Sequence, residues 1–405
     1  MRILVQKFGG TSLSTAEARE HAVKHIRRAL DEGYALAVVV SAMGRRGDPY
    51  ATDTLLGLIE ANGGSTDARE RDLLMACGET ISAATLCSML QTRGIPAIAF
   101  TGAQAGFETN AEFGNARIAT VRPDRVLAAL GEGKVAVVTG FQGATADGDV
   151  TTLGRGGSDT SATALGAALR AECVDIFTDV EGVLTADPRI VGDAKPLAEV
   201  TYTEICNMAN NGAKVIHPRA VEVAMAADLP VRIRSTFSDG PGTLVAGTAR
   251  LRAGGGEAVD RLITGIAHYT NVSQIQVAAT DGQYDLQLSV FKSMANHGIS
   301  VDLINVNPSG VAYTVNDAEA DRAVGLLKGL GYEPKVIRGC TKVSVIGGGM
   351  NGVPGVMATI IEALTEEDVG ILQSADSNTT IWVLVRSEDT VKAVNALHRK
   401  FKLHA

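Results

Sequence analysis

The chain has 405 residues, of which 45% are hydrophobic and 4% aromatic, and this length predicts two or three domains. Its 37 basic and 45 acidic side chains give a net charge of −8 without a basic stripe, which argues against a nucleic-acid-binding protein. The 5 cysteines lie far apart and form no C-x-x-C pair. We expect no targeting segment and no membrane-spanning apolar run, and therefore a cytoplasmic α/β protein.

The beginning of the chain predicts a βαβ unit. Residues 2–8, RILVQKF, have the pattern of a strand, and an amphipathic helix follows and ends at Gly33. Residues 35–42 are almost wholly apolar, which is typical of a strand in a parallel sheet that is covered on both faces. Further on, Asp147-Gly148 predicts a hairpin turn and residues 173–179 another buried strand.

The last third of the chain is a repeat that follows a predicted linker. Residues 249–261 contain three consecutive glycines and little hydrophobic pattern. After them, the sequence aligns with itself at an offset of 70 positions. Ile360 then falls on Val290, and other apolar residues fall on apolar residues. Each copy reads strand, helix, strand, strand, helix, with room for a further short strand, which is the ferredoxin-like βαββαβ pattern. We expect the copies to span residues 262–338 and 339–405.

A glycine-rich turn, KFGGTS, follows the first strand. Gly9 and Gly10 let backbone N–H groups approach a phosphate, and Lys7 can reach the same anion. Thr11 and Ser12 can cap the next helix. The alternative is a plain turn beside a solvated lysine. The spacing of a Walker A loop is missing.

A second glycine-rich motif, GRGGSDTSA, precedes a run of alanine and leucine. Arg155 and Asp159 are the only charged residues in the range 151–169. The glycines admit a close ligand, and Ser158 and Asp159 stand at N-cap positions. This combination indicates a ligand site that offers a bare backbone, one cation, one anion and the start of a helix. The alternative is that Asp159 only caps the helix and that Arg155 is solvated.

Glu79 is the only charged residue in the apolar helical stretch from Leu73 to Leu90. An ionised carboxylate there must be paired or neutralised, unless it occupies a lone solvent-facing position. The segment FTDVEGVLTADPR ends a strand at Thr178 and Asp179, which predicts a nucleotide-side loop at the carboxyl end of a sheet.

One motif matches a dinucleotide-binding pattern but is interpreted as structural. Gly347, Gly349 and Gly352 match G-x-G-x-x-G, the pattern of dinucleotide-binding loops, but they lie inside the repeat and the other copy lacks the pattern. We therefore expect a structural turn. The 7 histidines are scattered without metal-ligand spacing, so no protein-built metal site is predicted.

In chain order, VQKFGGTSL, VVVSAMG, GET, GRGGSDTSA, FTDVEGVLTADPR and AKVIHPRAVE resemble the aspartokinase family over essentially the whole chain. AFTGAQAGF and ILQSADSNTTIWVLV are most similar to its diaminopimelate-sensitive members. The resemblance implies an α/β amino-acid-kinase fold over residues 1–248, a mostly parallel open sheet covered by helices on both faces, followed by two ferredoxin-like ACT domains. The sequence departs from the family at Leu184, where many relatives have tyrosine, and at Asp281–Asp285, where a Pro-Gly turn is common.

The implied activity is ATP-dependent phosphorylation of the aspartate β-carboxylate, the first step of lysine, diaminopimelate, threonine and methionine synthesis, with Mg²⁺ held mainly by ATP and water. The β-carboxylate has a pKa of about 4 and is already ionised, so no general base is needed. The resemblance assigns catalysis to Lys7 and Asp159; substrate binding to Ser41, Thr52, Glu79, Arg155, Gly156, Gly157 and Ser158; and ATP binding to Lys7, Phe8, Gly9, Gly10, Thr178, Asp179, Leu184, Arg189, Lys214 and Val215.

The repeat is expected to bind an end-product amino acid between its copies and to join subunits into a homo-oligomer, a dimer or higher. In the repeat alignment Asp302 falls on Leu372 of the other copy, so its charge has no counterpart there. meso-Diaminopimelate is favoured because Asp302 could bind its second ammonium group, and lysine or threonine is the alternative. No nucleic-acid or membrane partner is expected. The expected effector contacts are Ile299, Ser300, Val301, Asp302, Gln373 and Ser374.

Two other functions are less compatible with the sequence. A dinucleotide-dependent oxidoreductase needs a parallel βαβ context, which the repeat contradicts. A non-catalytic amino-acid sensor would have lost the charged residues of the candidate site, and all of them are present.

Overall fold

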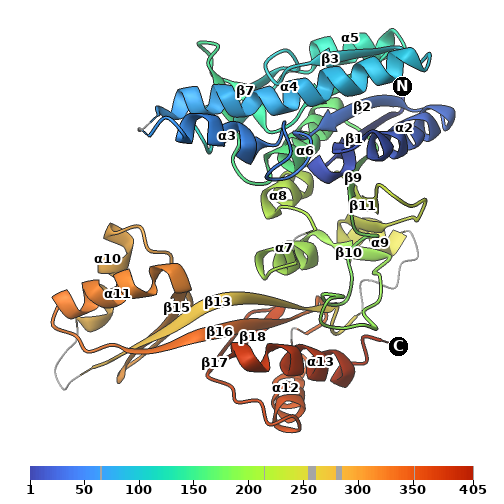
Figure 1. Ribbon diagram of the computed structural model, residues 1–405. Helices are drawn as coiled ribbons and strands as arrows, with labels where there is room; N and C mark the ends of the chain where they lie inside the picture. Colours follow the sequence, from blue (N-terminus) through green and yellow to red (C-terminus); the bar gives the residue numbers. More distant parts are fainter. Residues whose placement is uncertain (64–65, 214, 254–260, 280–284, 351, 405) are drawn as a thin grey trace. The chain divides into compact units, whose positions relative to one another are not determined.

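A computed structural model describes residues 1–63, 66–213, 215–253, 261–279, 285–350 and 352–404 (Figure 1). The chain forms two compact units. The first comprises Met1–Val183, Pro196–Ala209 and Lys214–Ala258, and the second Leu184–Lys195, Asn210–Ala213 and Val259–Ala405. Two segments of the predicted 1–248 domain therefore pack with the second unit.

The first unit has a large sheet and a small sheet. Its elements are β1 (Ile3–Phe8), α1 (Gly10–Leu13), α2 (Ala16–Asp31), β2 (Ala35–Val40), α3 (Thr52–Glu60), α4 (Ala68–Thr92), β3 (Ala97–Phe100), β4 (Phe107–Thr109), β5 (Ile118–Val121), α5 (Asp124–Gly131), β6 (Val135–Thr139), β7 (Gln142–Ala144), β8 (Val150–Thr152), α6 (Gly157–Leu169), β9 (Cys173–Thr178), β10 (Glu199–Thr201), α7 (Tyr202–Asn210), α8 (Pro218–Ala226), β11 (Val231–Ser235), β12 (Thr243–Ala246) and α9 (Thr248–Ala253).

The large sheet has eight strands in the order β10-β12-β11-β9-β1-β2-β6-β3. The pairing of β11 with β12 is antiparallel and its other pairings are parallel, which confirms the expected mostly parallel sheet. Phe8 lies beside Val40 and Phe177, and Val40 lies beside Thr139. The carboxyl ends of β9, β1, β2 and β6 therefore lie in one row.

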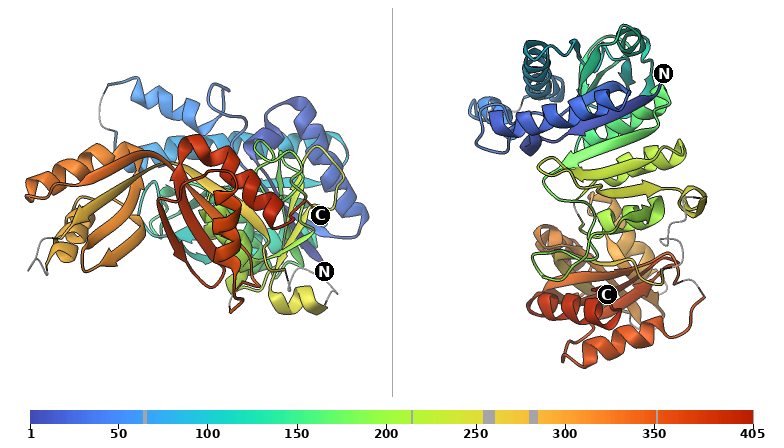
Figure 2. Two further views of the ribbon diagram at one scale, coloured as in Figure 1. Left: turned by 90° about the horizontal axis from the view of Figure 1, so that it is seen from below. Right: turned by 90° about the vertical axis from the view of Figure 1, so that its right-hand side faces the viewer.

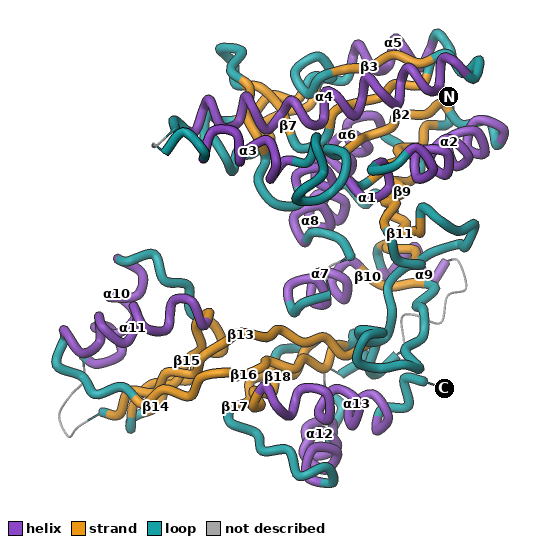
Figure 3. Tube along the Cα trace, viewed as in Figure 1, coloured by secondary structure: helices purple, strands orange, loops and turns teal. Residues whose placement is uncertain are grey.

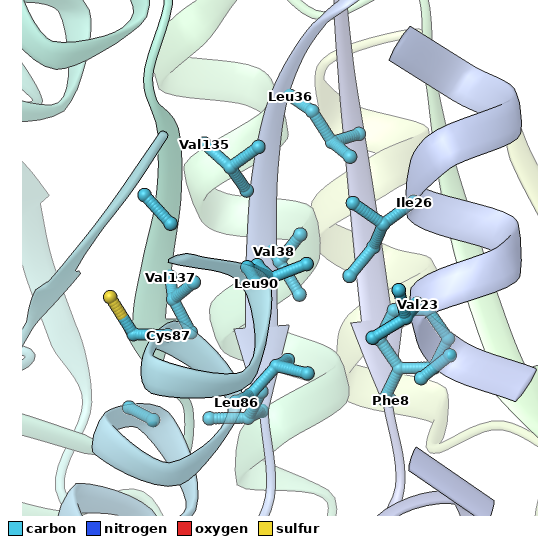
Figure 4. Close-up of a cluster of buried hydrophobic side chains, with 14 of the residues drawn as sticks. Phe8, Val23, Ile26, Leu36, Val38, Leu86, Cys87, Leu90, Val135 and Val137 are labelled. Carbon is cyan, nitrogen blue, oxygen red and sulfur yellow. The ribbon is translucent and has the colours of Figure 1, made fainter. Parts of the chain in front are cut away.

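Helices cover both faces of this sheet, as expected. Figure 4 shows Val23 and Ile26 of α2 and Leu86 and Leu90 of α4 packed against one face. On the other face α6 approaches closely, because Gly166 leaves space for the side chains of Val5 and Val174.

The helix α4 departs from one expectation. By length and composition it is apolar enough to cross a membrane, although no such run was expected. Its apolar character has a local reason, since Ala83, Leu86 and Leu90 are buried against the sheet. The small sheet, in the order β5-β4-β7-β8, contains the predicted hairpin: β7 pairs antiparallel with β8, and Gly148 in the turn has φ +91°.

The second unit contains the repeat. Its elements are β13 (Gly265–Ala278), α10 (Leu286–Asn296), β14 (Asp302–Asn307), β15 (Gly310–Asn316), α11 (Asp317–Gly329), β16 (Lys335–Ile346), α12 (Val356–Thr365), β17 (Gln373–Asp376), β18 (Thr380–Arg386), the 3₁₀ turn η2 (Ser387–Asp389) and α13 (Thr390–Lys400). The starts of β13 and β16, of α10 and α12, and of β15 and β18 are each 70 positions apart, so the sequence repeat is a structural repeat.

The two copies share their longest strands. The six-stranded antiparallel sheet has the order β14-β15-β13-β16-β18-β17, and Figure 3 shows β13 and β16 as continuous strands through its middle. The second half of β13 opens the first copy and the second half of β16 opens the second. Each copy is closed by the first half of the other copy's long strand, as the pairings of Gly265 with Ile346 and of Gln276 with Lys335 show. A boundary at residues 338–339 therefore cuts through β16.

Each copy has its own hydrophobic core. Val290, Tyr313 and Leu327 belong to one core, and Ile360 and Leu397 to the other. Figure 1 shows the helix pairs α10–α11 and α12–α13 at opposite ends of β13 and β16, and Figure 2 shows α12 beside α13.

Two local predictions can be examined. The glycine motif lies between β16 and α12 in an antiparallel sheet, where a side chain on Gly347 or Gly349 would meet the backbone of Arg261 and Leu262. It is the expected structural turn, not a dinucleotide loop. Within the predicted linker 249–261, the residues up to Ala253 belong to α9, and residues 254–260 lie outside the described residues.

Candidate functional site

The expected site residues of the first unit follow the carboxyl ends of parallel strands. Lys7 is the penultimate residue of β1 and Gly9 follows its end, while Ser41 follows β2. Thr178 ends β9, and the predicted Ser158 lies beside Gly140, which follows β6. Because these strands are neighbours in the sheet, its topology gathers the loops that the sequence separates by well over a hundred positions.

An ion pair lies at the middle of this edge. Lys7 Nζ is 2.7 Å from Asp159 Oδ1, and the side chains are 12% and 14% exposed. Asp159 lies in the first turn of α6, where a carboxylate is favoured by the helix dipole. Its Oδ2 accepts a bond from the backbone N–H of His217 at 3.4 Å. Asp159 thus fixes the position of the lysine head, so a second anion can approach Lys7 without reorganising it.

The glycines after β1 are required by close packing. A Cβ atom on Gly10 would lie 2.7 Å from the carbonyl oxygen of Gly44 and 2.8 Å from that of Ala42, so no side chain fits there. A Cβ on Gly9 would lie 3.5 Å from Lys7 Nζ, directly beside the cation. The bare backbone therefore keeps the space around Lys7 open.

The glycines before α6 are required for a different reason. Gly156, the N-cap of α6, has φ +70°, and a Cβ there would lie 2.1 Å from the ring of His217. Gly157 packs against Phe141, which itself has φ +66°. The loop is thus held in one strained conformation between β8 and α6.

Gly156→Ala should therefore abolish most activity and lower the melting temperature, since it combines a left-handed backbone with a clash. Gly148→Ala is the matched control, because Gly148 also has positive φ but nothing lies within 4 Å of its added Cβ. Thermal denaturation and turnover measured side by side would contradict this account if the two variants lost the same stability and activity.

Glu79 lies on the buried face of α4 and is 2% exposed. Its Oε1 accepts the backbone N–H of Ala42 at 3.1 Å. Its Oε2 is buried and has no hydrogen-bond partner among the residues that the structure describes. Burial raises the pKa of this carboxyl to about 8, against its ordinary value of 4.5. A buried carboxylate oxygen without a partner can receive a cationic group of a ligand.

Other expected substrate-binding residues lie in loops that pack close to this part of the first unit. Gly78 packs against Ala42 and the carbonyl of Tyr50, which brings the loop from Ser41 to Thr52 against α4. Ser158 Cβ lies 2.9 Å from the position of a Cβ on Gly140, so Ser158 is close to the end of β6. Arg155 is exposed and makes no hydrogen bond to any described residue, which leaves its guanidinium free for a ligand.

The nucleotide-side residues are only partly brought together. Thr178 donates to Asp179 Oδ1 at 3.2 Å, and Arg45 donates to Asp179 Oδ2 at 2.8 Å. Leu184 and Arg189 belong to the second unit, whereas Lys7 belongs to the first. The guanidinium of Arg189 is 2.6 Å from Asp187 and exposed. Val215 is half-buried in the first unit, and Lys214 lies outside the described residues.

Comparisons with known proteins bear on this arrangement. The amino acid kinase family model matches residues 2–235, and an ACT domain model matches residues 335–399. Aspartokinase 1 of Bacillus subtilis (strain 168) is 57% identical over 403 residues, which cover 100% of both chains. The chain belongs to the aspartokinase family. Aspartokinase of Geobacillus stearothermophilus is 37% identical over 409 residues, 100% of this chain and 98% of the relative.

Solved structures of relatives resemble this aspartokinase over nearly its full length. E. coli aspartokinase III in complex with aspartate and ADP, described as the R-state, has a TM-score of 0.79 at 28% identity and covers 98% of this chain and 99% of that one. The same protein with lysine and aspartate, the T-state, has a TM-score of 0.78 at 28% identity, with the same coverage.

The expected effector residues of this aspartokinase lie in the second unit. Asp302 begins β14 and pairs with Lys342 of β16, so it is not the lone charge that the repeat suggested. Gln373 of β17 donates to the carbonyl of Leu303, which joins the starts of β14 and β17. Ser300 and Ser374 are exposed and Val301 is half-buried. The side chain of Ile299 is 4% exposed and lies in the core of its copy.

Sequence reasoning missed two contributors to the site. His217 holds Asp159 through its backbone and limits Gly156 through its ring. Arg45 neutralises Asp179. Only the N-cap pattern of histidine before Pro218 could have drawn attention to His217, because the contact with α6 is long-range.

Proposed function

We propose that this aspartate kinase transfers the γ-phosphoryl group of ATP to the β-carboxylate of aspartate and forms 4-phospho-aspartate. The observation that carries the proposal is the Lys7–Asp159 pair at the end of β1, combined with the Glu79 carboxylate oxygen near the end of β2 that has no hydrogen-bond partner among the described residues. One feature suits phosphate and the other suits the ammonium of an amino acid.

Each proposed role follows from charge and position. Glu79 receives the substrate ammonium and becomes ionised when it does. Arg155 binds the α-carboxylate through two parallel hydrogen bonds. Ser41, Thr52, Gly156, Gly157 and Ser158 line the amino-acid side of the site.

The β-carboxylate attacks as an anion, so the protein need not remove a proton. Lys7 stabilises the charge on the transferring phosphoryl group, and Asp159 keeps Lys7 in place. Catalysis then consists of positioning and electrostatics.

The nucleotide is proposed to lie on Phe8, Gly9, Gly10, Thr178, Asp179 and Val215, with Leu184, Arg189 and Lys214 completing the site. ATP would bring Mg²⁺, which neutralises phosphate charge. The chain fits an ion held mainly by phosphates and water, since Asp159 and Asp179 are both already paired with cations.

The direct test measures ADP release and traps the acyl phosphate with hydroxylamine. Aspartate should give equal amounts of ADP and hydroxamate, and asparagine, which lacks the β-carboxylate, should give neither. Turnover of asparagine, or ADP release without hydroxamate, would contradict phosphorylation at this position.

Arg155→Lys should raise the aspartate KM about 10-fold with a smaller change in the ATP KM, because a point charge replaces a two-pronged donor. Arg170→Lys, at the C-cap of the helix α6 that follows Arg155, is the control and should leave both constants near wild type. An effect confined to the ATP KM would reverse the assignment of the two pockets.

We further propose feedback inhibition by meso-diaminopimelate bound near β14 and β17 of the second unit, with lysine or threonine as the alternative. It is supported by the joined starts of these strands and by the exposed Asp302 carboxylate. Homo-oligomers through the ACT domains and a cytoplasmic location belong to the same proposal.

Asp302→Ala should raise the inhibitory concentration of meso-diaminopimelate about 10-fold with little change in uninhibited kcat, because an ammonium partner is lost. Lys342→Met is the matched control, since it breaks the same ion pair from the other side and leaves the carboxylate free. If both variants weakened inhibition equally, Asp302 would matter only through Lys342.

A further inference from the structure

Three side chains with metal-binding atoms converge in the second unit, although the spacing of the histidines in the sequence predicted no metal site. The ligand atoms of Asp193, His398 and His404 all lie within 4.8 Å of one another. Asp193 and His404 are exposed, whereas His398 is fully buried. We propose that this cluster binds a divalent transition-metal ion of the zinc type.

The end of the chain is folded back to build the cluster. Helix α13 ends at Lys400, and Lys402 takes a left-handed conformation with φ +54°. The N–H of Leu403 then donates to the carbonyl of His398 at 3.1 Å, which is the long bond of a Schellman turn. This turn carries His404 over His398, and their ring centroids are 6.3 Å apart.

His398 is oriented as a ligand would be. Its Nε2 is 2.9 Å from the hydroxyl oxygen of Thr185, which also accepts the N–H of Lys195. Its Nδ1 is buried, has no hydrogen-bond partner within the described part of the chain, and lies 3.8 Å from Asp193 Oδ1. A hydrogen bond that holds one ring nitrogen while the other faces a second donor is the usual environment of a metal-bound imidazole.

The donor set selects the class of ion. Two imidazoles and one carboxylate suit Zn²⁺ and its neighbours in the first transition row, whereas Mg²⁺ and Ca²⁺ prefer oxygen donors. Bonds of about 2.1 Å in a tetrahedral site separate two ligand atoms by about 3.4 Å. The 3.8 Å between His398 and Asp193 needs only a small movement of the exposed carboxylate, and water can take the fourth position.

A bound ion would clamp the segment Leu184–Lys195 to α13. This segment already packs there through Ala186 and Val191, and Asn395 donates to the carbonyl of Ile190 at 3.1 Å. The first unit ends at Val183, five residues after Thr178 ends β9, and this segment begins at the next residue. The ion would therefore rigidify the chain that continues from the proposed nucleotide side.

The test uses the full-length protein after treatment with a chelator, in a Cys77→Ser background that removes an exposed thiol. Equilibrium dialysis with Zn²⁺ alone, without nucleotide, should give one ion per chain. His404→Ala and Asp193→Asn should each weaken binding by more than the roughly 10- to 100-fold that loss of an outer partner costs. His297→Ala, an exposed histidine of the same unit, should bind as the parent does.

Two further readouts keep the proposal testable. Co²⁺ should give the intense visible absorption of a low-coordinate site, which Zn²⁺ removes, and Zn²⁺ should raise the melting temperature of the parent but not of His404→Ala. The proposal is overturned if the parent binds no Zn²⁺ saturably. It is equally overturned if His404→Ala and Asp193→Asn retain the parent's affinity.

Discussion

Lys7→Ala should lower kcat by about 100-fold or more while the protein stays folded, because the lysine stabilises charge that develops during phosphoryl transfer. Lys7 is nearly buried and already oriented by Asp159, so its stabilisation requires no reorganisation at the moment of reaction. Turnover at saturating ATP and aspartate is the measurement. Lys24→Ala, which removes an exposed partner of Asp239, is the control and should change kcat little.

The single variant leaves Asp159 without its partner, which itself destabilises the site. The double variant Lys7→Ala/Asp159→Asn removes that charge and should fold better, yet remain slow. A double variant with near wild-type turnover would show that Lys7 only compensates Asp159 and has no catalytic role.

Glu79→Gln should reduce kcat/KM for aspartate by roughly 10- to 100-fold at pH 7, because a charged hydrogen bond to the ammonium becomes a neutral one. The ATP KM should change much less. Glu70→Gln, in the exposed first turn of the same helix, is the control and should behave as wild type. If Glu79→Gln raised only the ATP KM, the ammonium site would have to be sought elsewhere.

The same residue predicts how the stability of the unliganded enzyme depends on pH. The pKa of Glu79 is raised from 4.5 to about 8 by burial. Its protonated form is therefore the one compatible with the fold, and the associated stability is fully present below pH 4.5 and is lost as pH rises through 8. The upper bound on this loss is on the order of 5 kcal/mol.

Melting temperatures measured between pH 5 and pH 9 should consequently fall more in wild type than in Glu79→Gln. Aspartate should reduce the difference, because its ammonium stabilises the ionised carboxylate. Identical pH slopes for the two proteins would mean that Glu79 is not the buried acid described here.

Much of the first unit could be predicted because its signals are local. ALAVVV is apolar throughout, as a strand covered on both faces must be, and it forms β2. Glu79 stood out because one charge in an apolar helix has few explanations. The convergence of Lys7 with Asp159 was not visible in the spacing, since it is the packing of α6 against β1 that brings them together.

The second unit was harder to predict for a topological reason. A repeat of seventy positions shows that two copies exist, but not that β13 and β16 each serve both copies. The sequence also did not show that residues 184–195 belong to the second unit. Ala186 and Val191 look like ordinary loop residues until they are seen in the same hydrophobic core as Val394 and Leu397. Asp302 appeared unmatched because its partner Lys342 lies on a strand of the other copy.

The membership of residues 184–195 also limits how such an enzyme can be re-engineered. A chain that stops before Leu262 would keep Ala186 and Val191 but lose the apolar residues that cover them. Trimming the tail to escape feedback would thus damage the part of the chain that follows β9. A chimera that takes the C-terminal region of a relative would also need that relative's residues 184–195. The second unit therefore cannot be exchanged through a single fusion point.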